Sequence, residues 1–154
     1  MVNVLICDDQ LIVCEGLEKI LSSDPEINVV GIANNGAEAL ELIPDASPDI
    51  VLMDLKMPRM NGVIATRKIK EQFPGINVII LTTYDDDEWV FDAIRSGASG
   101  YLLKDLPPAD LIRAIKETEH GVSFVDPAIT HKLLTNITEM KPKADPPTNF
   151  QLLD

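Results

Sequence analysis

The sequence predicts a doubly wound α/β fold, in which one parallel sheet lies between two layers of helices. Short apolar segments alternate with segments of helical periodicity along the 154 residues. The apolar segments are almost continuously hydrophobic, as is typical of strands covered on both faces. Apolar residues make up 45% of the chain and aromatic residues 5%, which fits one α/β domain followed by a tail.

The elements alternate regularly from the N-terminus. Strands are expected at 2–7, 27–33, 49–53, 77–82 and 100–103. Helices are expected between them because apolar residues recur every three or four positions, as in Val13, Leu17, Ile20 and Leu21. Asn61-Gly62 and Pro107-Pro108 predict helix starts, and Gly97 and Gly121 predict helix ends. Right-handed crossovers between the parallel strands then give a three-layer domain.

The chain is expected to divide into a main domain and a tail. The main domain takes residues 1–122, and an appended helix is expected within 123–138, where Asp126 can cap it and Pro127 suits its first turn. Residues 139–154 are proline-containing and lack periodicity, which predicts a flexible linker.

Charge and composition exclude some classes of function. The formal net charge of -12 would repel a phosphate backbone, so this chain alone is expected to bind nucleic acid poorly. Apolar segments are too short for a membrane span and the N-terminus does not resemble a signal peptide, so we expect a cytoplasmic protein without membrane contact. Cys7 and Cys14 are interpreted as free buried thiols.

Polar residues gather where the predicted strands end. The first strand is followed by Asp8-Asp9, the third by Asp54 and the fifth by Lys104, while Thr82 ends the fourth. The carboxyl ends of parallel strands form the edge at which such sheets bind ligands. Three acids at one edge repel each other unless a cation compensates, and their hard oxygen ligands suit Mg²⁺.

Each of these residues also has a structural explanation. Asp9 could cap the following helix and Asp8 could be a solvated acid, while Asp54 could bind loop amides. Thr82 could be an ordinary strand residue and Lys104 a surface charge. Their coincidence at one edge favours a site. A carboxylate there can act as a nucleophile toward a phosphoryl group when nearby cations neutralise the transferring oxygens.

The motifs that carry these residues resemble the receiver domain of two-component response regulators over residues 1–125. They are DD at 8–9, MDLKMPRMNG at 53–62, LTTYDDDE at 81–88 and GASGYLLKD at 97–105. The last two are similar to the NarL/FixJ subfamily, whose members carry a LuxR-type helix-turn-helix output domain. The resemblance implies a flavodoxin-like sheet of five strands in the order 2-1-3-4-5.

The resemblance also implies a role for each site residue. Mg²⁺ or Mn²⁺ would be the cofactor, a sensor histidine kinase the phosphoryl donor, and phosphorylation would promote dimerisation. Tyr101 is expected to turn from an exposed to a buried position when Thr82 moves toward the phosphoryl group. The implied assignments are Asp54 as phosphoacceptor, Asp8, Asp9, Asp54 and the Lys56 backbone carbonyl as metal ligands, Lys104 as phosphoryl-binding lysine, and Thr82 and Tyr101 as switch residues.

Two departures from the family pattern are visible. Many receivers place a cis proline after the lysine, but Asp105 follows Lys104 here. No output-domain sequence occurs before Asp154, so DNA binding is expected only through a domain outside this sequence. The sequence is then expected to be either a truncated regulator or a receiver that acts alone.

A different functional class remains open from the residues. A Mg²⁺-dependent phosphatase of the haloacid dehalogenase type would also form an aspartyl phosphate, but it requires a second Asp two residues after the nucleophile. Lys56 occupies that position. We therefore expect a signalling switch with self-catalysed phosphoryl transfer and autodephosphorylation rather than an enzyme that turns over.

Overall fold

The fold is built on a parallel sheet of six strands in the order β2-β1-β3-β4-β5-β6. The computed structural model describes residues 1–83, 89–125, 130, 131 and 134. The predicted order 2-1-3-4-5 is confirmed, and a two-residue strand that was not predicted joins the edge next to β5. The strands are β1 (Val2–Cys7), β2 (Ile27–Ala33), β3 (Ile50–Asp54), β4 (Asn77–Thr82), β5 (Gly100–Leu103) and β6 (Phe124–Val125).

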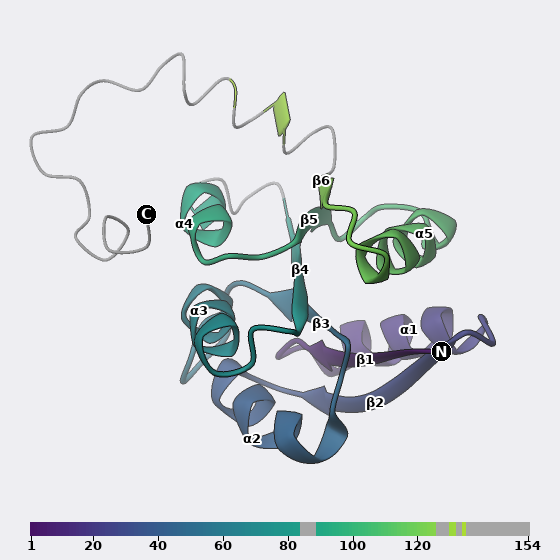
Figure 1. Cartoon of the computed structure of the whole chain (residues 1–154), viewed down its shortest axis with the longest axis horizontal. Helices are drawn as coiled ribbons and strands as arrows, with labels where there is room; N and C mark the ends of the chain where they lie inside the picture. Colours follow the sequence, from purple (N-terminus) through teal and green to yellow (C-terminus); the bar gives the residue numbers. More distant parts are fainter. Residues whose placement is uncertain (84–88, 126–129, 132–133, 135–154) are drawn as a thin grey trace, which may run out of the picture.

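Helices cover both faces of the sheet, as the nearly continuous hydrophobicity of the strands predicted (Figure 1). The helices are α1 (Leu11–Ser22), α2 (Gly36–Ala46), α3 (Gly62–Gln72), α4 (Val90–Arg95) and α5 (Pro108–Glu119). Buried residues of α1 and α5 form one core layer with the sheet, and those of α2, α3 and α4 form the other. The strands β1, β3, β4 and β5 are therefore held between two apolar layers, whereas the edge strand β2 is partly exposed along its length.

The helix boundaries follow from local chemistry. The side chains of Asn35 and Asn61 cap α2 and α3 by accepting hydrogen bonds from the amides of Glu38 and Ile64, each at 3.0 Å. Gly97 and Gly121 follow α4 and α5 with φ angles of +98° and +86°, a conformation that favours glycine. The predicted stop signals therefore lie where the helices end.

The segment after α5 begins with a short strand that was not predicted. Phe124 and Val125 pair with Gly100 and Tyr101 as β6, and they precede Asp126, the expected cap of the appended helix within 123–138. Two residues are too few to show strand periodicity in a sequence. Residues 130, 131 and 134 are helical, whereas the rest of the expected helix and the whole linker at 139–154 lie outside the described residues.

Two further expectations can be compared with the described part of the chain. No helix there combines the length and the hydrophobicity needed to cross a bilayer. No cis peptide bond occurs among the described residues, so the Lys104–Asp105 peptide is trans.

Candidate functional site

The predicted site residues lie at the carboxyl edge of the sheet. Asp54 ends β3 and pairs in register with Leu81, and Thr82, the next residue of β4, pairs with Leu103 of β5. The main-chain amide of Lys104 then donates to the Thr82 carbonyl at 2.8 Å, which continues the pairing beyond the strand end. The register of three neighbouring strands therefore fixes the positions of Asp54, Thr82 and Lys104 relative to one another.

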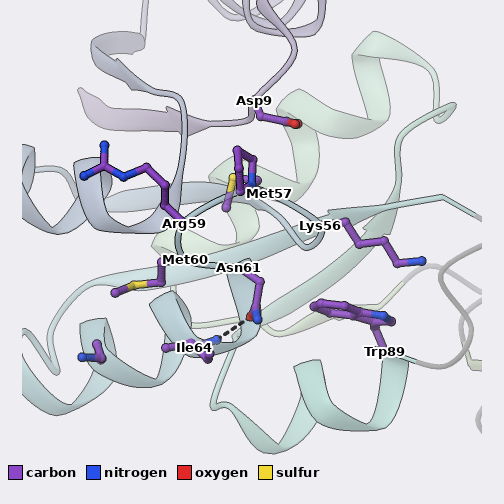
Figure 2. Close-up of a pocket in the computed structure, with 10 residues that line it drawn as sticks. Asp9, Lys56, Met57, Arg59, Met60, Asn61, Ile64 and Trp89 are labelled. Carbon is purple, nitrogen blue, oxygen red and sulfur yellow. Dashed lines mark hydrogen bonds between the residues drawn. The ribbon is translucent and has the colours of Figure 1, made fainter.

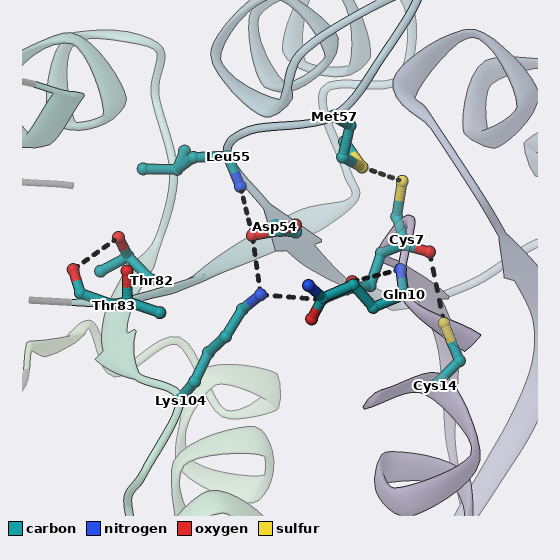
Figure 3. Close-up of polar contacts among 10 residues, drawn as sticks. Cys7, Gln10, Cys14, Asp54, Leu55, Met57, Thr82, Thr83 and Lys104 are labelled. Atoms are coloured by element: carbon teal, nitrogen blue, oxygen red, sulfur yellow. Dashed lines mark hydrogen bonds and ion pairs between the residues drawn. The ribbon is translucent and has the colours of Figure 1, made fainter. Parts of the chain in front are cut away.

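Lys104 joins two of the acids directly. Its Nζ lies 2.9 Å from Oδ1 of Asp54 (Figure 3). The same Nζ lies 3.0 Å from Oδ2 of Asp8. Two main-chain amides complete this network. Leu55 donates to Oδ1 of Asp54 and Gln10 donates to Oδ1 of Asp8, each at 2.9 Å. A contact of Asp54 with loop amides was one of the structural explanations open from the sequence, but the particular donors could not be named because any residue supplies the same amide.

Burial controls the charge of the central carboxylate. Asp54 is 6% exposed and Asp8 is 2% exposed, so both carboxylates are largely removed from water. Burial raises the pKa of Asp54 to about 6, although the Lys104 ammonium acts in the opposite direction. Burial would lower the pKa of Lys104, but its contacts with Asp54 and Asp8 outweigh burial and raise it. Lys104 is therefore charged at neutral pH and stabilises the ionised form of Asp54.

The acids meet the requirements of a divalent cation. Oxygen atoms of Asp8, Asp9 and Asp54 lie within 4.8 Å of one another, and Asp9 is exposed, so the cluster opens to solvent. Three carboxylates face the single ammonium of Lys104, which leaves an excess of negative charge when all are ionised. Hard oxygen donors with such an excess fit Mg²⁺ or a similar ion. The residues present therefore fit the cofactor that the resemblance implies.

The loop after β3 approaches the strand end very closely at Gly62. A Cβ atom at this position would lie 1.9 Å from the main-chain oxygen of Asp54, a distance that no real contact tolerates. The Gly62 amide donates to the Leu55 carbonyl at 2.7 Å and closes the loop. Gly62 was expected at a helix start and at the end of the motif at 53–62, and it also permits the close return of the chain beside Asp54.

The two proposed switch residues lie in different surroundings. Thr82 is buried at the edge, and its hydroxyl donates to the Thr83 carbonyl at 3.3 Å. Tyr101 lies inside the domain with 7% exposure, and its hydroxyl is 3.2 Å from the carbonyls of both Ala93 and Ala98. The expected exposed position of Tyr101 is therefore wrong for this structure, because packing against α4 buries the ring.

An open groove adjoins the acid cluster (Figure 2). Its volume is about 590 Å³, and it is lined by Asp9, the loop after β3, part of α3 and Trp89. The Lys56 side chain points away from Asp9, and its Nζ lies 5.7 Å from the centre of the Trp89 ring. The Lys56 ammonium is thus directed toward the aromatic ring. The predicted ligand role belongs to the main-chain carbonyl of Lys56 and does not involve this side chain.

Comparisons with known proteins agree with this geometry. The family described as the response regulator receiver domain matches residues 4–116. The chain is 38% identical over 133 residues to the transcriptional regulatory protein DegU of Brevibacillus brevis, covering 86% of this chain and 56% of that protein. It is also 38% identical over 154 residues to the oxygen regulatory protein NreC of Staphylococcus haemolyticus, covering 98% of this chain and 71% of the relative.

A solved structure supports the same conclusion. The LuxR-family two-component response regulator from Aurantimonas sp. SI85-9A1 superposes with a TM-score of 0.82 at 32% identity, covering 90% of this chain and 99% of that chain. The present chain spans little more than half of the length of the DegU relative. Accepting a phosphoryl group is typical of the family that matches here. The chain belongs to the response regulator receiver domain family.

Proposed function

We propose that Asp54 accepts a phosphoryl group from a sensor histidine kinase or from a small acyl phosphate. The observation that carries this proposal is the buried Asp54 carboxylate, which pairs with Lys104 at 2.9 Å and adjoins Asp8 and Asp9. An Asp54 oxygen would form a bond to phosphorus while the bond from phosphorus to the donor's nitrogen or acyl oxygen breaks. The leaving group departs with that bonding electron pair.

The surrounding residues divide the remaining tasks. Asp8, Asp9, Asp54 and the Lys56 carbonyl would hold Mg²⁺ or Mn²⁺. When bound, the ion supplies positive charge beside the transferring oxygens. Lys104 already contacts the Asp54 carboxylate. It would bind a phosphoryl oxygen in place of this carboxylate oxygen once the phosphoryl group is attached. Asp8 retains its Gln10 amide contact during this exchange, which would keep its carboxylate oriented.

The signal would leave through Thr82. A cavity of about 130 Å³ lies beside it and is also lined by Leu103 and Lys104, which gives the side chain space to move. The Thr82 hydroxyl could then donate to a phosphoryl oxygen instead of the Thr83 carbonyl. Tyr101 is two positions along from Leu103 on β5, so its packing against α4 could respond to this movement. We propose that the response alters self-association.

The wider role follows from the family and is also a proposal. Self-association would control transcription through a DNA-binding output domain that this sequence does not contain. Slow autodephosphorylation and a cytoplasmic location complete the proposed switch. No observation favours the phosphatase alternative, because Lys56 directs its ammonium toward Trp89 rather than offering an acid or base beside Asp54.

The test is intact mass after incubation with acetyl phosphate and Mg²⁺. We expect one added phosphoryl group in the wild type, none in Asp54→Ala, and none with a chelator. Lys104→Ala should reduce the yield without moving the modified residue, and peptide mapping would locate it. An adduct that forms equally in Asp54→Ala would refute the assignment, and continuous release of phosphate with substrate turnover would favour a phosphatase.

A further inference from the structure

The loop from Leu55 to Asn61 is held by contacts from several elements. At its base, the Gly62 amide donates to the Leu55 carbonyl at 2.7 Å. Near its far end, the Met60 carbonyl accepts a hydrogen bond of 3.0 Å from the amide of Gly36, the first residue of α2. From the β1 side, the Cys7 thiol lies 3.7 Å from the Met57 sulfur (Figure 3). The loop is therefore attached to β1 and α2 as well as to its own ends.

The contact with α2 depends on the missing side chain of Gly36. A Cβ atom there would lie 2.9 Å from both the carbonyl oxygen and Cγ of Met60. It would also lie 2.7 Å from Cβ of Ala65 in α3. Real Cβ contacts essentially never fall below 3.0 Å, so an alanine would force the loop, α3 or both to retreat. Glycine is required here by the close approach of the Met60 carbonyl and α3.

We infer that Gly36 is a positioning residue for the metal site. By admitting the Met60 carbonyl to its amide, it would fix the loop that presents the Lys56 carbonyl to the ion. The inference rests on the proposed function, which assigns that carbonyl as a ligand. Mg²⁺ requires nearly ideal octahedral geometry, so a displacement of the loop by a few tenths of an ångström should weaken binding. Gly36 would thereby act on the ion without touching it.

A purely structural role for Gly36 predicts something different. The shortest contact of the added Cβ is with Ala65, so glycine could serve only the packing of α2 against α3. The double variant Gly36→Ala/Ala65→Gly separates the two explanations. It removes the clash with Ala65 but retains the 2.9 Å contact with the Met60 carbonyl. Gly16→Ala is the matched control, because Gly16 is also helical and an added Cβ there meets nothing within 4 Å.

The experiment measures Mg²⁺ affinity directly. Trp89 is the only tryptophan in the chain and lies beside Lys56, so its fluorescence reports on this loop during a Mg²⁺ titration. Isothermal titration calorimetry gives the same affinity independently, and thermal unfolding in chelator gives the stability of each variant. We expect Gly36→Ala to weaken Mg²⁺ binding about tenfold, the lower end of the effect of residues that support metal ligands. Gly16→Ala should bind as the wild type does.

Phosphorylation supplies a second readout that lost stability would not imitate. With acetyl phosphate, Gly36→Ala should need about tenfold more Mg²⁺ for half-maximal rate and should regain the wild-type rate at saturating Mg²⁺. The double variant should keep the Mg²⁺ defect even though its packing clash is relieved. If Gly36→Ala does not fold, the double variant alone decides the question.

Each remaining outcome has one meaning. Wild-type Mg²⁺ affinity in Gly36→Ala, or its recovery in the double variant, would overturn the positioning role while leaving the proposed function intact. A wild-type chain that binds no Mg²⁺ by fluorescence and calorimetry would overturn the proposed metal site, and this inference with it.

Discussion

Replacing Asp54 by asparagine should stabilise the folded chain at neutral pH. Asp54 is 6% exposed, and burial raises its pKa from 3.8 to about 6. Below pH 3.8 the group is neutral in both folded and unfolded chains and burial costs little. As the pH rises through the folded pKa, the unfolded chain releases this proton more readily, so stability is lost. Asp54→Asn removes this loss because an amide does not titrate.

The size of the effect follows from the two pKa values. A tenfold change in acidity corresponds to about 1.4 kcal/mol, so the difference between 3.8 and about 6 amounts to about 3 kcal/mol. The gain in Asp54→Asn should be smaller, because Lys104 loses one of its two carboxylate partners. Asparagine can still accept from the Leu55 amide. We therefore expect a gain of about 1 to 2 kcal/mol at pH 7 and almost none near pH 4.

Urea unfolding of the wild type and Asp54→Asn in chelator at pH 4, 5.5 and 7 would measure the difference. Mg²⁺ at pH 7 should then stabilise the wild type more than Asp54→Asn, since only the wild type keeps all three carboxylates. Asp105→Asn is the control for removing an exposed acid from the same region. A difference that stays constant with pH, or a less stable Asp54→Asn at pH 7, would refute the reasoning.

Three further predictions test other parts of the molecule. Thr82→Ala should still accept phosphate by intact mass but lose most of the phosphorylation-induced increase in mass by light scattering; wild-type association would disprove the proposed coupling. Gly62→Ala should lower the free energy of unfolding by about 3 kcal/mol, because its Cβ would overlap the Asp54 carbonyl, whereas Gly75→Ala, with nothing within 4 Å, should have little effect in the same denaturant titration. This chain should show no sequence-specific duplex binding at physiological salt, given its charge of -12, and a gel shift at nanomolar concentration would contradict that.

The sequence predicted the layers and the site edge well because both depend on strong local patterns. Five apolar strands and their polar ends were recognisable without long-range information. The predicted third strand stopped at residue 53, whereas β3 includes Asp54 itself. This small difference matters for the site, because the ladder with Leu81 fixes the Asp54 main chain directly.

The features that were missed depend on contacts between distant segments. Nothing in the sequence around Tyr101 reveals that its ring will be buried, with its hydroxyl in hydrogen-bonding distance of the Ala93 and Ala98 carbonyls. The pairing of β6 with β5 is equally non-local and involves only two residues. The close approach of Gly36 to Met60 also joins elements that are separated by β3. Each of these features can be recognised only in the packed structure. In the sequence alone, a glycine, a tyrosine or two apolar residues are compatible with many local conformations.

The charges at the site also explain why acceptance of a phosphoryl group should require two cations. Lys104 cannot neutralise the cluster alone, since it already pairs with Asp8 and Asp54 while Asp9 adds a third carboxylate. An approaching phosphoryl group would therefore meet net negative charge and be repelled. A divalent ion held by the acids would cancel that excess of negative charge and compete with Lys104 for their oxygens. The Lys104 ammonium would then be free to turn toward the incoming anion, so metal binding should prepare the lysine as well as the carboxylate.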